Sequence, residues 1–424
     1  MSFGEDIGAL VAANAFGVLS AAPDWSRVPL GSVSRIVNGY PFESKLFGRS
    51  DGVQLVRIRD VVGGRSETRY RGPVPKGYSV EDGDLLVGMD GDFNSAFWRG
   101  GPAVLNQRVC KIDTDESRLR RKFLGYLLPG YLKLINANTS SITVKHLSSK
   151  TLQQLPIPLP DTATQDAILA HVDGLFAEID EGEQALAAAR EGLCSYRKAL
   201  LNAAVAGGLT AAWRGETPNE EPHRVPVGWQ YLRVGQAGRV QLGRQRTPKD
   251  HAGPYMRPYL RVANVFEDRI SVDDVMSMNF SPSEFKTFAL AAEDILLNEG
   301  QSLELVGRPA MYHDDVPGCC FQNTLVRFRA GPSVNPDFAL IVFLHKFHVG
   351  EFQSIAKITT NIAHLGAGRF SELPFPVPPM EEQREIARVF REREVVVREP
   401  LATVNSNGLR QSILAAAFRG ELAA

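Results

Sequence analysis

The chain has 424 residues, of which 44% are apolar and 22% charged, and its formal net charge is −1. This length allows two or three domains with proper cores, and the composition is that of an ordinary soluble protein. The four cysteines lack Cys-x-x-Cys spacing, which points to reduced thiols in a cytoplasmic protein rather than to a disulfide framework. Since no segment reaches the roughly 20 apolar residues that span a bilayer, we expect no membrane contact.

Residues 1–24 stand outside the pattern that organises the rest of the chain. Residues 7–22 are apolar and small, but Glu5 and Asp6 precede them where a signal peptide carries Lys or Arg. We therefore interpret residues 1–24 as an N-terminal extension, helical and docked on the body. A targeting segment is the alternative.

Residues 25–158 form the first globular segment. Short β-like runs, separated by glycine turns, occur at 32–37, 53–58, 84–87 and 107–112, and a helix is expected over 117–134. The segment holds 20 Lys and Arg against 12 Asp and Glu. This local excess favours a nucleic-acid partner, although solvated helix surfaces also produce such segregation of charge.

The sequence Leu-Pro-Ile-Pro-Leu-Pro at 155–160 ends this segment. Because proline fixes φ and lacks the N–H donor, the block is neither helix nor central strand, and we expect a stiff extended exit. Residues 159–213 follow as a helical spacer of about 42 helical residues, a rod of roughly 60 Å. Its apolar residues recur in coiled-coil steps, so the rod needs a partner; they are Ile168, Val172, Leu175, Ile179, Leu186, Leu193 and Leu200.

Residues 224–378 repeat the first segment, with a strand at 259–265 and a helix at 337–349. The block Leu-Pro-Phe-Pro-Val-Pro at 373–378 lies 218 residues after the first, Gln165 is answered by Gln383, and Trp25 is answered by Trp229 at an offset of 204. This second segment is nearly neutral, with 16 cationic against 15 anionic residues. Such a two-fold pseudo-repeat suits a target that is itself bipartite.

Residues 379–424 form the second helical spacer, expected to run as a helix from Glu381 to about Phe418. Its seam is weaker, and Pro400 should kink or break it; the seam residues are Ile386, Phe390 and Val397. We expect an antiparallel pair in which Ile179, Leu186 and Leu193 pack around Phe390 and Val397. A local bundle within one domain is the alternative.

The chain shows no nucleotide phosphate loop and no cluster with zinc-ligand spacing. His345 and His348 could share one face of a helix, but no third metal ligand lies nearby, so helix-surface histidines are expected. The string Asn-Pro-Asp-Phe at 335–338 superficially resembles the tetrapeptide of adenine methyltransferases. Its third residue is Asp, however, and Asn335 suits the N-cap of a helix that starts with Pro336.

The globular segments instead offer polar loops suited to DNA. Arg binds guanine bidentately, Asn and Gln bind adenine in the same way, and Arg and Lys bind phosphates. We expect Arg57 and Arg59 to share one strand face, and Arg261 with Asn264 to occupy the matching strand of the repeat. Any one of these could be an ordinary solvated residue, but recurrence in both repeats favours the set: Arg57, Arg59, Arg69 and Arg71 in the first segment, and Arg244, Arg246, Lys249, Arg261, Asn264, Gln301 and Asn361 in the second.

Taken together, these features resemble the specificity subunit of type I restriction–modification enzymes. The resemblance rests on two Leu-Pro-x-Pro-x-Pro blocks, each followed by Gln and Ile, and on long helices that end in Ala-Ala-Val-x-Gly at 203–207 and Ala-Ala-Phe-x-Gly at 416–420. It covers nearly the whole chain from Trp25 onward. One departure is Thr164-Gln165, where the second repeat has the common Glu-Gln at Glu382-Gln383.

The resemblance implies an α+β protein with two target recognition domains joined by two long antiparallel coiled-coil helices. Such a subunit is not an enzyme and binds no cofactor. It reads a bipartite double-stranded DNA target and docks two methyltransferase subunits, which bring S-adenosylmethionine, and restriction subunits, which use ATP and Mg. A coiled-coil scaffold that binds only proteins, or a DNA methyltransferase with its own recognition domain, are the alternative interpretations.

Overall fold

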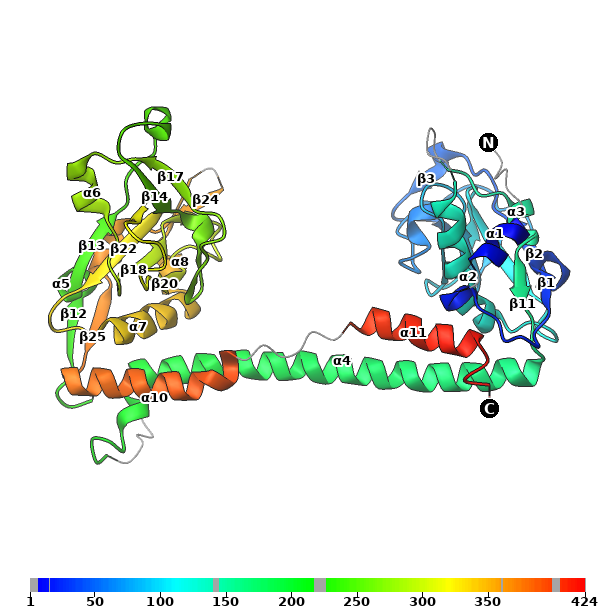
Figure 1. Ribbon diagram of the computed structural model, residues 1–424. Coiled ribbons are helices and arrows are strands. Elements are labelled where there is room, and N and C mark those ends of the chain that lie inside the picture. Colours follow the sequence, from blue (N-terminus) through cyan, green and yellow to red (C-terminus); the bar gives the residue numbers. More distant parts are fainter. Residues whose placement is uncertain are drawn as a thin grey trace. The chain divides into compact units, whose positions relative to one another are not determined.

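The computed structural model describes residues 7–14, 16–139, 145–216, 226–359, 361–398 and 405–423. The chain divides into two compact units, Met1–Ala185 with Thr403–Ala424, and Leu186–Ala402 (Figure 1). Each unit combines β-sheets with packed helices. The α+β class and the two-fold internal repeat predicted from the sequence are therefore confirmed.

The first unit is built on two sheets. A four-stranded antiparallel sheet has the order β2 (Ser34–Asn38), β10 (Val109–Thr114), β7 (Leu85–Gly88) and β8 (Asn94–Phe97). Helix α2 (Arg121–Ala137) shares the apolar core of this sheet through fully buried side chains such as Phe123 and Leu127. A five-stranded sheet has the order β3 (Phe47–Gly48), β5 (Arg69–Tyr70), β4 (Val53–Val56), β9 (Ala103–Leu105) and β6 (Ser79–Val80).

The second unit repeats this plan. Its four-stranded sheet has the order β13 (Gly238–Leu242), β22 (Leu325–Ala330), β18 (Ile295–Asn298) and β20 (Pro309–Met311), and helix α7 (Pro336–His348) shares its core. A second sheet has the order β17 (Met276–Asn279), β14 (Met256–Leu260) and β21 (Cys320–Phe321), and a third has β19 (Gly300–Gln301), β24 (Ile362–His364) and β23 (Lys357–Thr359). In both units the second sheet contains one parallel pair, β4 with β9 and β14 with β21.

Gly39 and Gly243 lie where the four-stranded sheet of each unit meets the sheet that contains the parallel pair. A Cβ atom on Gly39 would lie 1.9 Å from the carbonyl oxygen of Asn106, and one on Gly243 would lie 2.2 Å from that of Gln322. The backbones approach too closely there for any side chain, which explains why both repeats keep glycine at this offset.

The remaining elements are short and join the sheets to the helices. In the first unit they are α1 (Ile7–Ala13), α3 (Ser149–Gln153), η1 (Gly17–Leu19), η2 (Leu30–Ser32), η3 (Ser44–Leu46) and η4 (Ile58–Asp60). In the second they are α5 (Val234–Ala237), α6 (Pro282–Phe288), α8 (Glu351–Ile355), α9 (Ala367–Glu372), β15 (Val265–Phe266), β16 (Arg269–Ile270), η5 (Gly208–Thr210), η6 (Pro248–His251) and η7 (Val262–Asn264).

The proline blocks leave the globular segments as extended strands, as predicted. Strand β11 (Pro156–Pro158) pairs antiparallel with β1 (Arg27–Pro29), and β25 (Pro374–Val377) pairs antiparallel with β12 (Gln230–Arg233). Each pair is a separate two-stranded sheet, where proline costs few ladder hydrogen bonds. The extension before Trp25 also behaves as expected, because Ile7 and Val11 of α1 are buried in the core of the first unit.

The described part of the spacers holds helix α4 (Thr162–Val205), which is 44 residues long, and helices α10 (Met380–Arg398) and α11 (Ser406–Phe418). The last two lie within the range where one helix was expected, and residues 399–404 between them are outside the described residues. Pro400, at which a break was expected, lies outside the described residues. Helix α11 packs in the first unit, where Phe418 meets Phe123 edge-on at 5.4 Å, and α10 packs in the second.

The apolar seam of α4 is buried only toward its ends. Ile168 and Val172 lie in the core of the first unit and Leu200 in that of the second. In the stretch between them, Leu175, Ile179, Leu186 and Leu193 are only half-buried.

On the partner side, Ile386 and Phe390 are buried with Leu200 in the second unit, and Val397 is half-buried. Ile179 belongs to the first unit and Phe390 to the second, and within the described residues α4 pairs with α11 in the first unit and with α10 in the second.

Matching arginines brace the two helix pairs. Arg197 of α4 donates to Glu394 of α10 at 2.8 Å, and Arg410 of α11, 213 residues later, pairs with Asp180 and, at 3.1 Å, with Glu183 of α4. Successive contacts run in opposite order along the two segments of each pair, since Arg197 meets Glu394 but the later Thr210 meets Glu382, and Arg410 meets Glu183 but the later Leu422 lies by His171. The antiparallel orientation expected from the sequence is thus present within each unit.

Glu382 accounts for the departure noted between the repeats. This carboxylate is 1% exposed and accepts hydrogen bonds from Trp229 Nε1 at 2.9 Å and Thr210 Oγ1 at 2.7 Å, and it pairs with Arg214. The first repeat has Thr164 in place of Glu382 and Ala423 in place of Thr210. A buried carboxylate there would lack the Thr210 donor, so a short hydroxyl residue suits the position better.

We predict that Glu382→Ala lowers the free energy of unfolding by about 3 kcal/mol, because it leaves a buried indole N–H, a hydroxyl and a guanidinium without their shared acceptor. Thr164→Ala, at the matching position of the first repeat, is the control and should cost about 0.5 kcal/mol. Urea unfolding followed by circular dichroism measures both. Equal losses in the two variants would contradict the assignment of Glu382 as a structural anchor.

Candidate nucleic-acid interface

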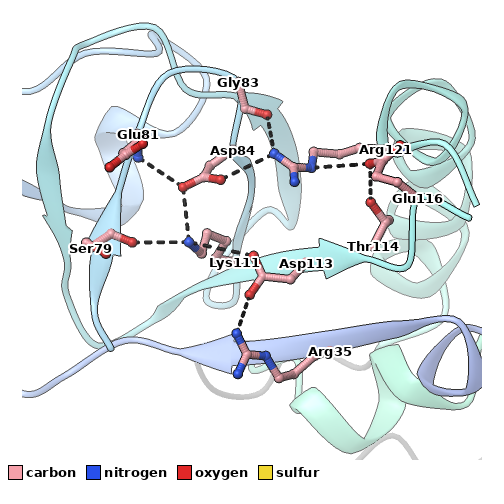
Figure 2. Close-up of polar contacts among 10 residues, drawn as sticks. All are labelled: Arg35, Ser79, Glu81, Gly83, Asp84, Lys111, Asp113, Thr114, Glu116 and Arg121. Carbon is pink, nitrogen blue, oxygen red and sulfur yellow. Dashed lines mark hydrogen bonds and ion pairs between the residues drawn. The ribbon is translucent and has the colours of Figure 1, made fainter. Parts of the chain in front are cut away.

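Several cations of the basic first segment are neutralised inside the domain. Figure 2 shows Asp84 between Lys111 and Arg121, with Lys111 Nζ 3.1 Å from Oδ2 and Arg121 Nη1 3.4 Å from Oδ1. Arg35 pairs with Asp113 across β2 and β10 at 2.8 Å. These ion pairs tie β7 to β10 and α2. Their charges serve the four-stranded sheet, so cations available to DNA must lie elsewhere.

The second unit has the same kind of anchor. Asp294 precedes β18 as Asp84 precedes β7, and it is 1% exposed. Arg329 donates to both of its carboxylate oxygens at 2.6 Å, and Arg327 lies 3.6 Å from one of them. These arginines were not predicted from the sequence, and their pairing with the buried Asp294 carboxylate gives them a structural role.

Arg57 lies at the end of the central strand of the five-stranded sheet. The expectation that Arg57 and Arg59 share one strand face is wrong, because β4 ends at Val56 and Ile58–Asp60 forms a 3₁₀ turn. The Asp60 carboxylate accepts the Arg57 backbone N–H at 2.9 Å and so starts this turn. Arg59 then points to Thr68, whose hydroxyl it reaches at 3.3 Å.

The Arg57 guanidinium lies over the ring of Phe47, 5.9 Å from its centroid, and makes no ion pair or hydrogen bond within the part of the chain that the structure describes. Two further predicted arginines lie nearby in the same sheet. Arg69 donates to the Gly52 carbonyl at 3.2 Å, and the exposed Arg71 lies 3.9 Å from Asp51. The first domain therefore gathers Arg57, Arg69 and Arg71 around β3, β4 and β5, without buried acids to neutralise them.

Arg244 is committed to the interior of the second domain. Its side chain is 14% exposed and pairs with Asp250 at 2.8 Å and Glu284 at 2.6 Å. The hydrogen bond from Arg244 lowers the pKa of Asp250 to about 2, so this pair stays charged at neutral pH. The prediction that Arg244 contacts DNA is therefore corrected, because its Nε and Nη2 groups already bind Glu284 and Asp250. Arg246 is half-buried and Lys249 is exposed.

Arg261 and Asn264 occupy the turn that matches Arg57 and Asp60. Asn264 is 2% exposed, accepts the Arg261 backbone N–H at 3.1 Å, and donates to the carbonyls of Ser271 and Asp274 at 3.0 Å each. Its amide is used up by the turn, so the prediction that Asn264 reads a base is wrong. The Arg261 guanidinium pairs with Asp274, an exposed partner that DNA can displace.

Gln301 and Asn361 lie in the small sheet formed by β19, β24 and β23. Asn361 is exposed, has a φ of 70°, and stands where the chain turns between β23 and β24. All of β23 is exposed, including Ile358 at 59%. Strands β23 and β24 form a two-stranded ribbon, a shape that fits the major groove of DNA. Gln301, in β19 beside β24, is half-buried.

Arg257 was not among the residues predicted from the sequence. This exposed residue of β14 lies over the ring of Phe285, 4.4 Å from its centroid, and its guanidinium makes no ion pair or hydrogen bond within the described ranges. Phe285 stands 28 positions away in α6, so no local pattern could have revealed the contact. Arg57 and Arg257 are thus arginines that lie over a phenylalanine ring, one in each domain, and that make no ion pair or hydrogen bond within the described residues.

Asn335 and His348, which were weighed above as parts of a methyltransferase motif and of a metal site, have structural surroundings, and so has the Cys319 thiol. Asn335 caps α7 as predicted, its side chain accepting the Phe338 N–H at 3.0 Å. His348, expected on a helix surface, is partly buried, and burial together with Arg197 and Lys198 lowers its pKa to about 4. Burial raises the pKa of the Cys319 thiol to about 12.

The requirements of a metal site and of a membrane-spanning helix can be compared with the described residues. No group of three or more His, Cys, Asp or Glu side chains there is placed to hold a metal ion. Within the same ranges, no helix combines the length and the apolar character needed to cross a bilayer.

Comparison with known proteins identifies the family. The family model described as the type I restriction modification DNA specificity domain matches residues 23–187 and 226–392. The specificity subunit of the type I restriction enzyme EcoBI from Escherichia coli is 35% identical over 457 aligned positions, covering 100% of this chain and 92% of that protein. The EcoKI specificity subunit of Escherichia coli K12 is 23% identical, covering 94% and 89%.

Solved structures share the fold. A chain from a structure described as "Structural basis underlying complex assembly and conformational transition of the type I R-M system" matches with a TM-score of 0.66 at 17% identity, covering 95% of this chain and 99% of that one. The HsdS subunit from Thermoanaerobacter tengcongensis matches with a TM-score of 0.55 at 18% identity, covering 95% and 98%. Because two copies of the family domain span most of its length, the chain belongs to the specificity subunits of type I restriction–modification systems, the non-catalytic subunits that recognise the DNA sequence.

Proposed function

We propose that each globular domain reads one half of an interrupted DNA target, while the helices keep the two halves at a fixed gap. The observation that carries this proposal is that each domain holds one arginine over a phenylalanine ring, although the two arginines do not occupy corresponding positions of the repeat. Arg57 in the first domain and Arg257 in the second each lie on a phenylalanine ring without an acidic partner in the described chain. Stacking holds a guanidinium plane in place while its N–H edge stays free for a guanine or a phosphate.

Since this chain is proposed only to read DNA and to set the gap, other subunits must carry out the chemistry. We propose that two methyltransferase subunits dock on the helices and bring S-adenosylmethionine, and that restriction subunits bring ATP and Mg. The exposed face of α10 supports a protein partner, since its charges already form pairs within the helix, such as Arg388 with Glu385 at 2.7 Å and with Glu392 at 2.6 Å. Such self-paired surfaces attract DNA weakly, which leaves the helices free for protein contacts.

We predict that the purified subunit alone neither binds S-adenosylmethionine nor transfers its methyl group to DNA. The reason is that this chemistry is assigned to the partner subunit. Isothermal titration with the cofactor, and a methyl-transfer assay on DNA, check the two parts separately, and adding the methyltransferase subunit should restore both signals. Transfer by partner-free protein would refute the assignment.

We predict that Arg57→Ala relaxes one position of the first half-site and costs roughly 1–3 kcal/mol if the residue contacts guanine bidentately. Arg57→Lys should not rescue that loss, because lysine lacks the planar fork. If Arg57 instead contacts a phosphate, Ala weakens all sequences alike and flattens the salt dependence, and Lys restores binding.

Mapping of methylated sites by sequencing, with binding measured across salt concentrations, separates the two outcomes. Arg257→Ala should act in the same way on the second half-site. Arg35→Ala, which removes an exposed arginine from the other sheet of the first domain, is the matched control and should leave the motif intact. An unchanged motif and affinity in both the Arg57 and Arg257 variants would show that DNA binds another face.

We predict that four residues inserted into α4 near Gly182 lengthen the gap between the half-sites. The insertion adds about 6 Å and roughly one helical turn, close to two base pairs, and Gly182 is exposed with open space around it. Methylated-site mapping reads the gap directly. Four residues inserted at the exposed Gly77 turn are the control and should leave it unchanged. A constant gap in an active α4 insertion variant would mean that the helix does not set the spacing.

A further inference from the structure

Gln165, in the first turn of α4, is fully buried and joins three parts of the first unit. Its Nε2 donates to the carbonyls of Arg118, at 2.8 Å, and Pro160, at 2.9 Å. Its Oε1 accepts, at 2.8 Å, the backbone N–H of Arg120, the N-cap residue of α2. One carboxamide therefore ties the proline block, the spacer helix and the main helix of the recognition domain together.

Gln383, in the first turn of α10, makes the same three bonds in the second unit. It is fully buried and donates to the carbonyls of Ser333, at 2.9 Å, and Pro378, at 2.8 Å. It accepts the backbone N–H of Asn335, the N-cap residue of α7, at 2.7 Å. We call each of these arrangements an amide junction.

Only a carboxamide satisfies such a junction. The two carbonyls need N–H donors, and the backbone N–H of the helix N-cap residue needs an acceptor. A carboxylate has no donor, so it would place its own oxygens against the two carbonyl oxygens. An apolar side chain of the same length would leave two buried carbonyls and one buried N–H without partners. Besides the apolar packing of Ile168 and Val172, the first domain and its spacer are linked by exposed ion pairs such as Lys122 with Asp173 at 2.6 Å, and ion pairs of this kind are weak and screened by salt.

We infer that Gln165 and Gln383 are positioning residues that fix the angle between each recognition domain and its spacer helix, and thereby restrict the complex to one gap length. This inference rests on the proposed function, in which the helices carry two separate readers. A site whose gap differs by one base pair is displaced by about 3.4 Å and rotated by roughly 34°. A stiff junction makes that displacement costly, and a junction without its three hydrogen bonds bends to meet it.

The test uses the subunit assembled with its methyltransferase partner, with methylated sites mapped by sequencing. Gln383→Met, close to the wild-type side chain in volume, should keep both half-site sequences but methylate sites with a gap one base pair longer or shorter. We expect discrimination against those gaps to fall by at least about tenfold, because all three hydrogen bonds of the junction are lost. Gln165→Met should give the same broadening from the other domain.

Asn335→Ala is the matched control. It removes the side-chain cap of the same helix, at 3.0 Å from the Phe338 nitrogen, but leaves the backbone N–H that Gln383 binds. Both variants should lower the melting temperature, whereas only the glutamine variant should broaden the gap. If Gln383→Met fails to assemble, Gln383→Asn keeps the amide but shortens its reach and gives the same comparison.

A single sharp gap in both glutamine variants, or equal broadening in Asn335→Ala, would overturn the positioning role. Such a failure is distinct from failure of the proposed function. If the Gly182 insertion shifts the gap while the glutamine variants leave it sharp, the helices still measure the distance and only the amide junction is excluded. If the insertion leaves the gap unchanged, the spacer proposal itself fails.

Discussion

Proline blocks create an unusual demand for hydrogen-bond donors. In Leu-Pro-x-Pro-x-Pro every second residue lacks an N–H, so the block offers carbonyls that its own backbone cannot satisfy, and buried carbonyls need partners. Gln165 and Gln383 supply those donors for Pro160 and Pro378 from the first turn of the helix that follows. The same side chains accept the backbone N–H of the N-cap residues of α2 and α7. Each recognition domain therefore leaves on a stiff strand and meets its spacer through a buried polar contact.

The charges of the molecule serve two purposes that its sequence does not separate. Lys111, Arg121 and Arg329 hold sheets together through carboxylates that are largely buried. Arg57 and Arg257 lie instead over aromatic rings and have no acidic partner in the described residues. A nearly neutral protein can thus bind DNA through those cations of its two domains that are not paired with buried carboxylates.

Much of the architecture could be predicted because it follows from local rules. Proline in the exit blocks, Asn335 as an N-cap and the repeated order of strands all depend on neighbours in the sequence. The roles of individual site residues depend on distant ones. Asn264 was assigned to base reading, yet it is consumed by carbonyls of Ser271 and Asp274.

Arg244 is a similar case, since nothing near it in the sequence reveals that Glu284 neutralises it, and the stacking of Arg257 on Phe285 is hidden for the same reason. The spacer seam was predicted as continuous because heptad periodicity says which face is apolar but not which partner covers it. The structure covers the ends of α4 with α11 in one unit and α10 in the other.

The central claim is that the two domains read DNA independently on a shared helical frame. Exchange of residues 226–378 for the matching domain of the Escherichia coli relative that is 35% identical, followed by mapping of methylated sites, tests it most directly. The account predicts a hybrid target that keeps the first half-site and the gap of this subunit and takes its second half-site from the relative. A change in the first half-site or in the gap would contradict it.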